Sequence, residues 1–323
     1  MAKILVTEPI PEIVIECLSK AGEVVVGEKG FYQSPENLIN NIGEFDALLC
    51  MLSNPVNESV LKAAHDLKIV ANFAVGYNNI NVKAAHKLGI KVANTPDVLT
   101  EACGDFAMGL LLALSRRFID AEAYLRAGKF KGWEPLGFLG MELRNKTLGI
   151  IGMGRIGQAF AQRARAFGMK IAYHNRSRLS NQLENELQAT YYADHLELGE
   201  ACDVISLNCP LTEETHHLVD QNFLGKLRPH VLLINISRGA VIDEEALAQS
   251  LHNKKIAGAA LDVFEHEPEI HPTLLTAPNT LLLPHIASAT FETREAIGML
   301  AAEAIVAVLE GKADKEIPNL IHP

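Results

Sequence analysis

The sequence predicts an α/β protein made of two Rossmann-like or flavodoxin-like domains, each a doubly wound parallel sheet, with a cleft between them. Apolar segments of strand length alternate with segments of helical periodicity along nearly the whole chain. That alternation indicates parallel strands buried under helices on both faces. The length of 323 residues exceeds what one hydrophobic core usually organises and suits two domains of roughly 100–200 residues each.

The first series of elements lies before residue 100. We expect strands at residues 3–9, 23–27, 46–52, 68–76 and 91–96, and helices at residues 11–21, 35–42, 57–67 and 82–88. These elements are sufficient for one parallel sheet covered by helices.

A second series of strands begins near residue 147. We expect strands at residues 148–152, 170–175, 203–210, 230–237, 256–263 and 280–287. A single connecting helix is predicted over residues 100–125, and a helix over 290–311 that returns to the first domain. The predicted first domain is therefore residues 1–99 plus 288–323, and the predicted second domain is residues 100–287. Small ligands usually bind in the cleft between two such domains.

Composition excludes several classes of protein. The net charge of −10 argues against a nucleic-acid partner, whose phosphates require a basic face. The longest apolar run, residues 108–114, is far shorter than the ~20 residues of a membrane span, and the first residues enter a strand without the layout of a signal peptide. Five scattered cysteines form neither a disulfide framework nor a metal pattern. We therefore expect a cytoplasmic protein.

A glycine-rich turn predicts a dinucleotide site. Gly152, Gly154 and Gly157 follow an apolar strand and open a helical segment, the context in which this spacing is specific. The first glycine permits the tight turn, the second lets the pyrophosphate approach and the third lets helix pack on strand. The N–H groups at the start of the helix, near Arg155 and Ile156, would face the pyrophosphate.

Residues 175–178 indicate which dinucleotide binds. An NAD site usually carries Asp or Glu here to hold the ribose hydroxyls, and that carboxylate would repel the 2′-phosphate of NADP. This chain has neutral Asn175, then Arg176 and Arg178, which can clamp a phosphate, and Ser177, which can donate a hydrogen bond. The prediction is that NADP(H) is preferred and NAD(H) is possible. The alternative is that both arginines are solvated residues of a surface loop.

Several segments resemble one family. The D-isomer-specific 2-hydroxyacid dehydrogenases have similar sequences, in the same order, over nearly the whole chain, at residues 74–80, 93–102, 149–157, 208–215, 232–247, 260–268 and 282–290. The arginine-bearing loop looks most like that of the glyoxylate/hydroxypyruvate reductases. The resemblance implies NADPH-dependent reduction of small 2-ketoacids, glyoxylate or hydroxypyruvate, to 2-hydroxyacids.

The resemblance also implies three catalytic residues. Arg238 would grip the substrate carboxylate and 2-keto oxygen. His285 would donate a proton to the ketone as hydride arrives, and Glu267 would hydrogen-bond His285. The chemistry requires such a set, since negative charge develops on the ketone oxygen and a nearby acid and cation both lower the barrier. No metal is needed. By position alone, each of the three could be an ordinary surface residue at a strand end.

Substrate contacts are implied in the first domain. Val75 and Gly76 would offer backbone N–H groups to the substrate carboxylate. Leu52 and Ser53 would line the side-chain end of the pocket.

Further cofactor contacts are implied in the second domain. Asp262 and the backbone near Ile236 would hydrogen-bond the nicotinamide carboxamide. Thr100 would lie near the nicotinamide, and Cys209 and Pro210 near the adenosine half.

The chain departs from the family pattern at two positions. Asn81 stands where Asp is common, and it is expected to cap a helix nearly as well. Ala287 stands where Gly is common, and its methyl group is expected to narrow the pocket beside the catalytic histidine.

The remaining histidines predict no metal site. His216, His217, His266 and His271 lack a metal-ligand spacing, and we expect all four to be solvated.

Two alternatives remain open. One is a 3-phosphoglycerate or other D-2-hydroxyacid dehydrogenase, and the other is a non-catalytic, NAD(P)-sensing corepressor on the same scaffold. In each case the family suggests a homodimer formed through the nucleotide domain, with the 100–125 segment in the contact and Trp133 filling an interface.

Overall fold

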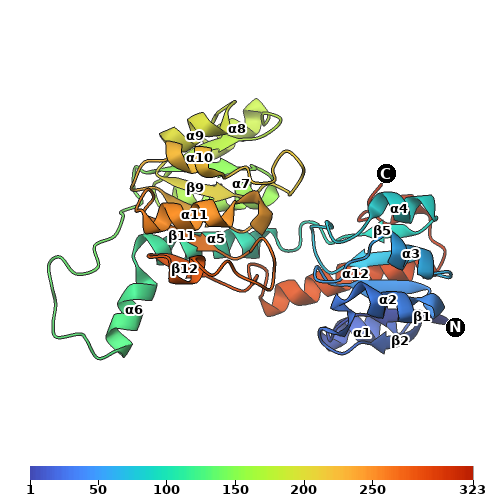
Figure 1. Cartoon of the computed structure of the whole chain (residues 1–323). Helices are drawn as coiled ribbons and strands as arrows, with labels where there is room; N and C mark the ends of the chain where they lie inside the picture. Colours follow the sequence, from blue (N-terminus) through green and yellow to red (C-terminus); the bar gives the residue numbers. More distant parts are fainter. Residues whose placement is uncertain (323) are drawn as a thin grey trace. The chain divides into compact units, whose positions relative to one another are not determined.

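The computed structural model describes residues 1–322, and the chain divides into two compact units (Figure 1). The first unit joins Met1–Leu99 to the segment from Ala289 onward, and the second is Thr100–Ser288. Each unit is an α/β structure around one parallel sheet.

The sheet of the first unit has five strands in the order β2-β1-β3-β4-β5, the flavodoxin-like arrangement. All its pairings are parallel. The strands are β1 (Ala2–Val6), β2 (Gly22–Val26), β3 (Ala47–Cys50), β4 (Ile69–Asn72) and β5 (Lys91–Ala93). The helices are α1 (Glu12–Leu18), α2 (Pro35–Asn41), α3 (Glu58–Ala63), α4 (Val82–Lys87) and α12 (Phe291–Leu309), with short 3₁₀ turns at Phe31–Gln33, Ile42–Glu44 and Asp314–Glu316.

Helices cover both faces of this sheet (Figure 1). On one face α2, α3 and α4 bury a core that includes Leu5, Leu48 and Val70, none of which is exposed. On the other face α1 and α12 pack on the sheet and on each other. Asn81 caps α4, because its side chain accepts the N–H of Ala84 at 3.0 Å, and the capping prediction is confirmed.

The sheet of the second unit has seven strands in the order β12-β11-β10-β9-β6-β7-β8, again all parallel. The strands are β6 (Thr147–Ile151), β7 (Lys170–His174), β8 (Ala189–Tyr191), β9 (Val204–Leu207), β10 (Leu232–Asn235), β11 (Gly258–Leu261) and β12 (Thr280–Leu282). The strand order reverses between β6 and β9, and ligands bind outside the carboxyl ends of strands at such a reversal.

Two helical layers sandwich this sheet (Figure 1). One core cluster lies under α5 and α7 and includes Leu111 and Phe160, and the other includes Phe223 of α10 and Leu247 of α11. The helices are α5 (Thr100–Ser115), α6 (Phe118–Arg126), α7 (Arg155–Ala166), α8 (Asn181–Leu187), α9 (His195–Ala201), α10 (Gln221–Lys226) and α11 (Glu244–His252), with 3₁₀ turns at Gly239–Val241 and Leu274–Thr276.

The prediction of one helix over residues 100–125 is wrong. The segment forms two helices, and they are separated at Arg117, whose φ of 53° lies in the left-handed region. The chain returns against the end of α5, where Met141 donates its N–H to the carbonyl of Ser115 at 2.8 Å. Strand β8 was not predicted either. This edge strand has only three residues, and none of them is buried.

The described residues also bear on two of the exclusions. No helix within residues 1–322 is long and apolar enough to cross a membrane. All five cysteines are free thiols, and four of them are buried.

We predict that Gly298→Ala destabilises the first unit. Gly298 lies where α12 packs on α1, and an added Cβ would collide with Val14 and approach Phe73 to 3.0 Å. Overpacking of this kind costs about 1–3 kcal/mol, measurable by urea unfolding. Gly225→Ala in α10 is the matched control, because its Cβ would meet no described atom within 4 Å apart from its chain neighbours and the nearby α10 backbone, and Ala favours helix. Equal unfolding midpoints for the two variants would contradict the prediction.

Candidate active site

The three predicted catalytic residues follow adjacent strands of the second sheet. Arg238 follows β10, Glu267 follows β11 and His285 follows β12. Because the carboxyl ends of parallel strands meet at one edge of a sheet, residues far apart in sequence gather there. The structure places these three at that edge.

His285 and Glu267 are hydrogen-bonded. His285 Nδ1 lies 2.9 Å from Glu267 Oε2, and Glu267 Oε1 accepts the backbone N–H of Phe264 at 3.0 Å. Both carboxylate oxygens are therefore fixed.

The charge state of Glu267 fixes the histidine tautomer. Burial raises the pKa of Glu267, but the hydrogen bond and charge of His285, the Phe264 N–H and the Arg238 charge outweigh it, and the pKa lies below its ordinary value. An ionised carboxylate only accepts hydrogen bonds. Nδ1 therefore carries its proton toward Glu267, and Nε2 is the ring nitrogen that can exchange a proton with a substrate.

Arg238 is held at the turn after β10. Its Nη1 donates to the carbonyl of Ser237 at 2.7 Å. Burial lowers the pKa of Arg238, and the charge of Glu267 acts in the opposite direction. Because the ordinary pKa of arginine is 12.5, the guanidinium is still a cation at neutral pH.

Asn235 shapes the turn after β10. The only sign of this role in the sequence is that a polar residue stands at the end of a strand. Asn235 is fully buried. Its Nδ2 donates to the carbonyl of Arg238 at 2.9 Å, and its Oδ1 accepts the N–H and the hydroxyl of Ser237 at 2.9 and 2.8 Å. These bonds set the direction in which Arg238 leaves the strand.

Asp262 fixes the backbone beside His285. Its two carboxylate oxygens accept the N–H groups of Ile286 and Ala287, each at 2.8 Å, and its carbonyl accepts the N–H of His285 at 2.8 Å. Burial raises the pKa of Asp262, although the two N–H donors act against it. The contact with a nicotinamide carboxamide stays a prediction; in the structure Asp262 positions residues 285–287, and Ala287 is buried at this point.

The glycine-rich turn after β6 fits a pyrophosphate. A Cβ on Gly152, whose φ is +98°, would lie 2.5 Å from the nitrogen of Cys209, and one on Gly157 would lie 2.5 Å from the carbonyl oxygen of Gly152. At Gly154 no described atom other than those of its chain neighbours lies within 4 Å of the Cβ position, so this glycine leaves the approach open. Gly154 precedes α7, whose first residues are Arg155 and Ile156. The N–H groups of a helix start bind anions.

The loop after β7 uses its polar residues unequally. Asn175 Oδ1 accepts the N–H of Met153 at 2.6 Å and so secures the glycine-rich turn. Arg178 donates through Nε and Nη2 to the two oxygens of Glu184, both at 2.8 Å. Arg176 and Ser177 are exposed.

Glu184 is an anchor that sequence reasoning missed. It also accepts the hydroxyl of Tyr173 at 2.5 Å, and the hydrogen bonds from Arg178 and Tyr173 hold the pKa of Glu184 at about 2. The guanidinium of Arg178 lies over the ring of Tyr191, 5.5 Å from its centroid. Arg178 is therefore a cation already paired with a carboxylate. Arg176 lies near the exposed carboxylate of Glu214 instead. The pKa of Glu214 is lowered, first by the Thr212 hydroxyl and to a smaller extent by the charge of Arg176.

The other predicted cofactor residues lie in the same unit. Cys209 backs Gly152 through its main chain, and burial raises the pKa of its thiol to about 11. Pro210 is exposed. Ile236 is half-buried after β10, and Thr100 is the first residue of α5.

The predicted substrate residues lie in the first unit. Val75 and Gly76 follow β4, and Leu52 and Ser53 follow β3, which is the neighbouring strand. The structure therefore brings these four to the same sheet edge of that unit.

Three asparagines, of which Asn72 is buried and Asn79 and Asn94 are half-buried, secure both loops, which the sequence did not reveal. Asn72 Nδ2 donates to the carbonyl of Gly76 at 2.6 Å, and Asn94 Nδ2 donates to that of Val75 at 2.7 Å. Asn79 Nδ2 lies between the carbonyls of Met51 and Asn54 at 3.0 and 3.1 Å. The carbonyls of the 75–76 turn are thus held within the protein.

The expectation that all four remaining histidines are solvated is wrong for two of them. His217 Nε2 lies 2.7 Å from Glu265 Oε1, and the Nδ1 of the half-buried His271 is buried without a hydrogen-bond partner among the described residues. His216 and His266 are exposed.

Comparison with known proteins shows the family. Residues 108–287 match the model of the D-isomer specific 2-hydroxyacid dehydrogenase NAD binding domain. The glyoxylate reductase of Thermococcus litoralis is 44% identical over 99% of this chain and 96% of its own length. The chain therefore belongs to the D-isomer-specific 2-hydroxyacid dehydrogenase family. It is an oxidoreductase that uses a nicotinamide dinucleotide.

Solved structures agree with this assignment. A D-isomer specific 2-hydroxyacid dehydrogenase from a Polaromonas species is 36% identical, with a TM-score of 0.92 and full coverage, 100%, of both chains. The NADPH-dependent glyoxylate/hydroxypyruvate reductase of Sinorhizobium meliloti, in complex with NADP and malonate, is 37% identical, with a TM-score of 0.86 over 100% of this chain and 99% of its own. The predicted family and the predicted pair of parallel-sheet α/β domains are confirmed.

We predict that Asp262→Asn lowers the stability of the second unit by about 1–3 kcal/mol. An amide offers one acceptor oxygen, so its NH₂ group would face the N–H of Ile286 or Ala287 and leave that donor without a partner. The midpoint of urea unfolding measures the effect. Asp220→Asn is the matched control, since Asp220 caps α10 and Asn caps equally well. An Asp262→Asn midpoint equal to that of the control would refute the positioning role.

Proposed function

We propose that the protein reduces small 2-ketoacids, glyoxylate and hydroxypyruvate, to 2-hydroxyacids with NADPH, and that His285 is the general acid. The observation that carries this proposal is the Glu267–His285 hydrogen bond of 2.9 Å beside Arg238 at one sheet edge. The names of the similar glyoxylate reductases and of the NADPH-dependent structural relative support the substrate class and the cofactor.

Three side chains divide the reaction. Arg238 binds the substrate carboxylate and keto oxygen with its planar fork of donors, and Glu267 orients His285. His285 transfers the proton from Nε2 to the keto oxygen as negative charge develops there, and takes it back in the oxidative direction. When bound, the reduced nicotinamide supplies the hydride. Val75 and Gly76 donate N–H groups to the substrate carboxylate, and Leu52 and Ser53 border its side chain.

The second unit would hold the cofactor. The Gly152–Gly157 turn and the start of α7 receive the pyrophosphate, and Arg176, Ser177 and the remaining Nη1 donor of Arg178 receive the 2′-phosphate. Cys209 and Pro210 border the adenosine, while Thr100, Asp262 and the Ile236 backbone border the nicotinamide.

The two units accordingly have separate roles in this proposal. The first unit is the substrate-binding domain and the second is the dinucleotide-binding domain. We also propose a cytoplasmic location, which the free thiols support.

The test is the loss of NADPH and NADH absorbance with glyoxylate, hydroxypyruvate, pyruvate and a branched 2-ketoacid, with 3-phosphoglycerate oxidation measured in parallel. We expect fast NADPH oxidation with the two small acids. Turnover with 3-phosphoglycerate alone would make the protein that dehydrogenase, and no turnover at all would leave the dinucleotide-sensing alternative.

We predict that Arg238→Ala lowers kcat/KM for glyoxylate by about 10²–10³-fold, the usual loss when a group that stabilises developing charge is removed. The Kd for NADPH, measured by its fluorescence, should change little because Arg238 contacts the substrate. Steady-state kinetics with Arg144→Ala, an exposed arginine in the same unit, provides the control. An unchanged kcat/KM in Arg238→Ala would exclude this role.

We predict that Arg176→Ala raises the KM for NADPH roughly 10- to 100-fold, the effect of one lost hydrogen bond between charged groups, and leaves the KM for NADH unchanged. Arg178→Ala should affect NADPH less and thermal stability more, because Glu184 already holds two of its donors. Equal use of NADPH and NADH by the wild-type protein would show that these arginines are surface charges.

We further propose a homodimer formed through the second unit. Helix α6 and the segment after it project from that unit (Figure 1) and carry apolar side chains that the chain itself does not cover: Trp133 is 84% exposed, Leu136 81% and Leu139 64%. Apolar residues gathered on one exposed segment mark a protein contact.

We predict that Trp133→Glu with Leu136→Glu converts the dimer to a monomer, since a charge in the apolar contact would be desolvated without a partner. Light scattering after size exclusion should give a mass near twice 35.2 kDa for the wild type and near 35.2 kDa for the variant. Leu275→Glu, at an exposed leucine elsewhere in the unit, should leave the mass unchanged. A wild-type monomer would contradict the proposal.

A further inference from the structure

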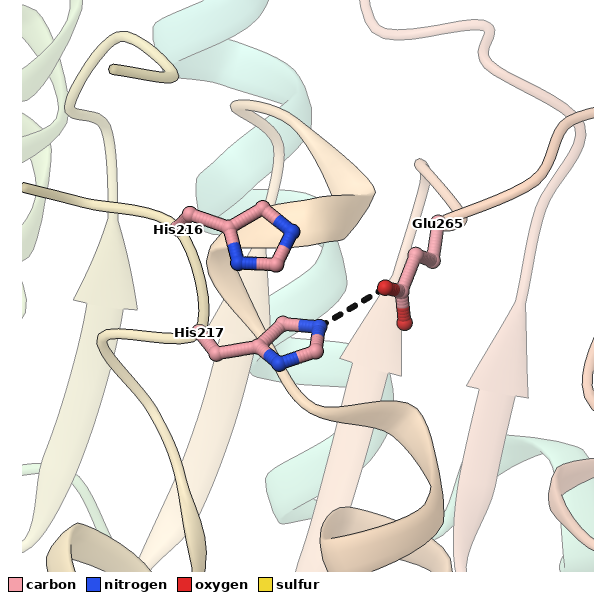
Figure 2. A group of neighbouring side chains, drawn as sticks. All are labelled: His216, His217 and Glu265. Atoms are coloured by element: carbon pink, nitrogen blue, oxygen red, sulfur yellow. Dashed lines mark hydrogen bonds and ion pairs between the residues drawn. The ribbon is translucent and has the colours of Figure 1, made fainter. Parts of the chain in front are cut away.

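Three side chains with metal-binding atoms meet outside the Arg238, Glu267 and His285 group. His216 and His217 come from the loop before α10, and Glu265 comes from the segment after β11. One ligand atom from each lies within 4.8 Å of the other two. Figure 2 shows the two imidazole rings one above the other, with the Glu265 carboxylate facing them.

We propose that His216, His217 and Glu265 form a binding site for one divalent transition-metal ion of the Zn²⁺ type. Two imidazoles and one carboxylate are donors that Zn²⁺ accepts, whereas Mg²⁺ and Ca²⁺ prefer oxygen ligands throughout. Water would complete a four-coordinate site with three protein ligands.

The separations fit with small side-chain movements. Ligand distances of 2.0–2.2 Å in a tetrahedral site place neighbouring ligand atoms roughly 3.4 Å apart. His217 Nε2 and Glu265 Oε1 are 2.7 Å apart, so this pair opens by less than ~1 Å, and the other pairs close by at most ~1.5 Å from their 4.8 Å limit. Rotation about side-chain bonds supplies changes of this size.

The backbone of both segments is fixed, so the ligands start near their positions. His217 donates its N–H to the carbonyl of Ala240 at 2.8 Å, and His216 donates its N–H to that of Thr212 at 3.0 Å. Glu265 donates its N–H to the carboxylate of Glu244 at 2.7 Å, and Glu244 is only 5% exposed. Ligands on a constrained backbone lose less entropy on binding.

Exposure and charge favour a cation from solution. His216 is exposed, and His217 and Glu265 are partly exposed, so an ion can enter without unfolding. Glu213 and Glu214 precede the histidines on the same loop, which adds negative charge near the site.

The hydrogen bond between His217 and Glu265 alone does not account for His216. The ring of His216 is exposed, yet it lies over that of His217 with centroids 4.0 Å apart and 29° between the planes. A shared ion explains why both rings present a nitrogen toward Glu265. Such an ion would also link the 215–219 and 264–267 segments, and it should therefore stabilise the second unit.

The experiment is calorimetric titration of the chelator-treated full chain with ZnCl₂, and with MgCl₂ for comparison. We expect one Zn²⁺ per chain and no Mg²⁺ binding. His216→Gln and Glu265→Gln should each weaken Zn²⁺ binding tenfold or more, and His65→Gln, at an exposed histidine of the first unit, should leave it unchanged. Equal affinity in the wild type and the double variant His216→Gln with Glu265→Gln would overturn the proposal.

Thermal unfolding provides an independent readout. Zn²⁺ should raise the Tm of the wild type, because a ligand of the native state stabilises it by mass action, and the rise should disappear in His216→Gln. His216 forms no part of the packed interior, so this variant folds normally by circular dichroism. An equal rise in His216→Gln and the wild type would place Zn²⁺ elsewhere and refute the site.

Discussion

The parallel pairing of all seven strands in the second unit is the constraint on which its chemistry depends. Since every strand runs in the same direction, every carboxyl end reaches the same edge of the sheet. The glycine-rich turn follows β6, and Arg238, Glu267 and His285 follow β10, β11 and β12. Residues separated by nearly fifty positions, such as Arg238 and His285, thereby reach the same edge of the sheet. One reversed strand would carry its loop to the opposite edge.

Sheet topology brings the loops together, but buried polar side chains fix their directions. Asp262 holds the backbone beside His285, and Asn235 holds the turn before Arg238. Asn72 does the same for the 75–76 turn in the first unit. A satisfied hydrogen bond contributes only about 0.5–1.5 kcal/mol net, whereas a buried group left without its partner costs about 1–3 kcal/mol. These residues therefore fix the loop conformation mainly because any alternative conformation would leave a buried polar group without its partner and would be higher in free energy.

The sequence predicted the elements well but not the details that complete the site. Strand segments such as 3–9 and 68–76 overran β1 and β4 at their carboxyl ends. After β4 the reason is that residues 73–76 are as apolar as the strand. The break at Arg117 escaped notice, since its cause is a left-handed backbone stabilised by the returning chain. The sequence of residues 175–178 identified Arg178 as a cation but did not reveal Glu184 as its partner. Local spacing does not distinguish a carboxylate that faces an arginine from one that faces water. The pairing of His217 with Glu265 was hidden for the same reason: forty-eight residues separate them.

The chain carries a net charge of −10, yet its proposed cofactor and substrate are both anions. The contradiction disappears once distance is considered, since surface charges beyond about 8–10 Å are screened at physiological ionic strength. A bound anion therefore responds to the groups that touch it, and in the proposed function those are the Arg238 cation, the Arg176 cation and the N–H groups at the start of α7. Arg178 contributes less, because Glu184 neutralises it. The pairing of Arg178 with Glu184 leaves Arg176 as the more available cation of the loop after β7. In the proposed function, discrimination between a phosphate and a hydroxyl at the ribose therefore depends chiefly on one exposed side chain.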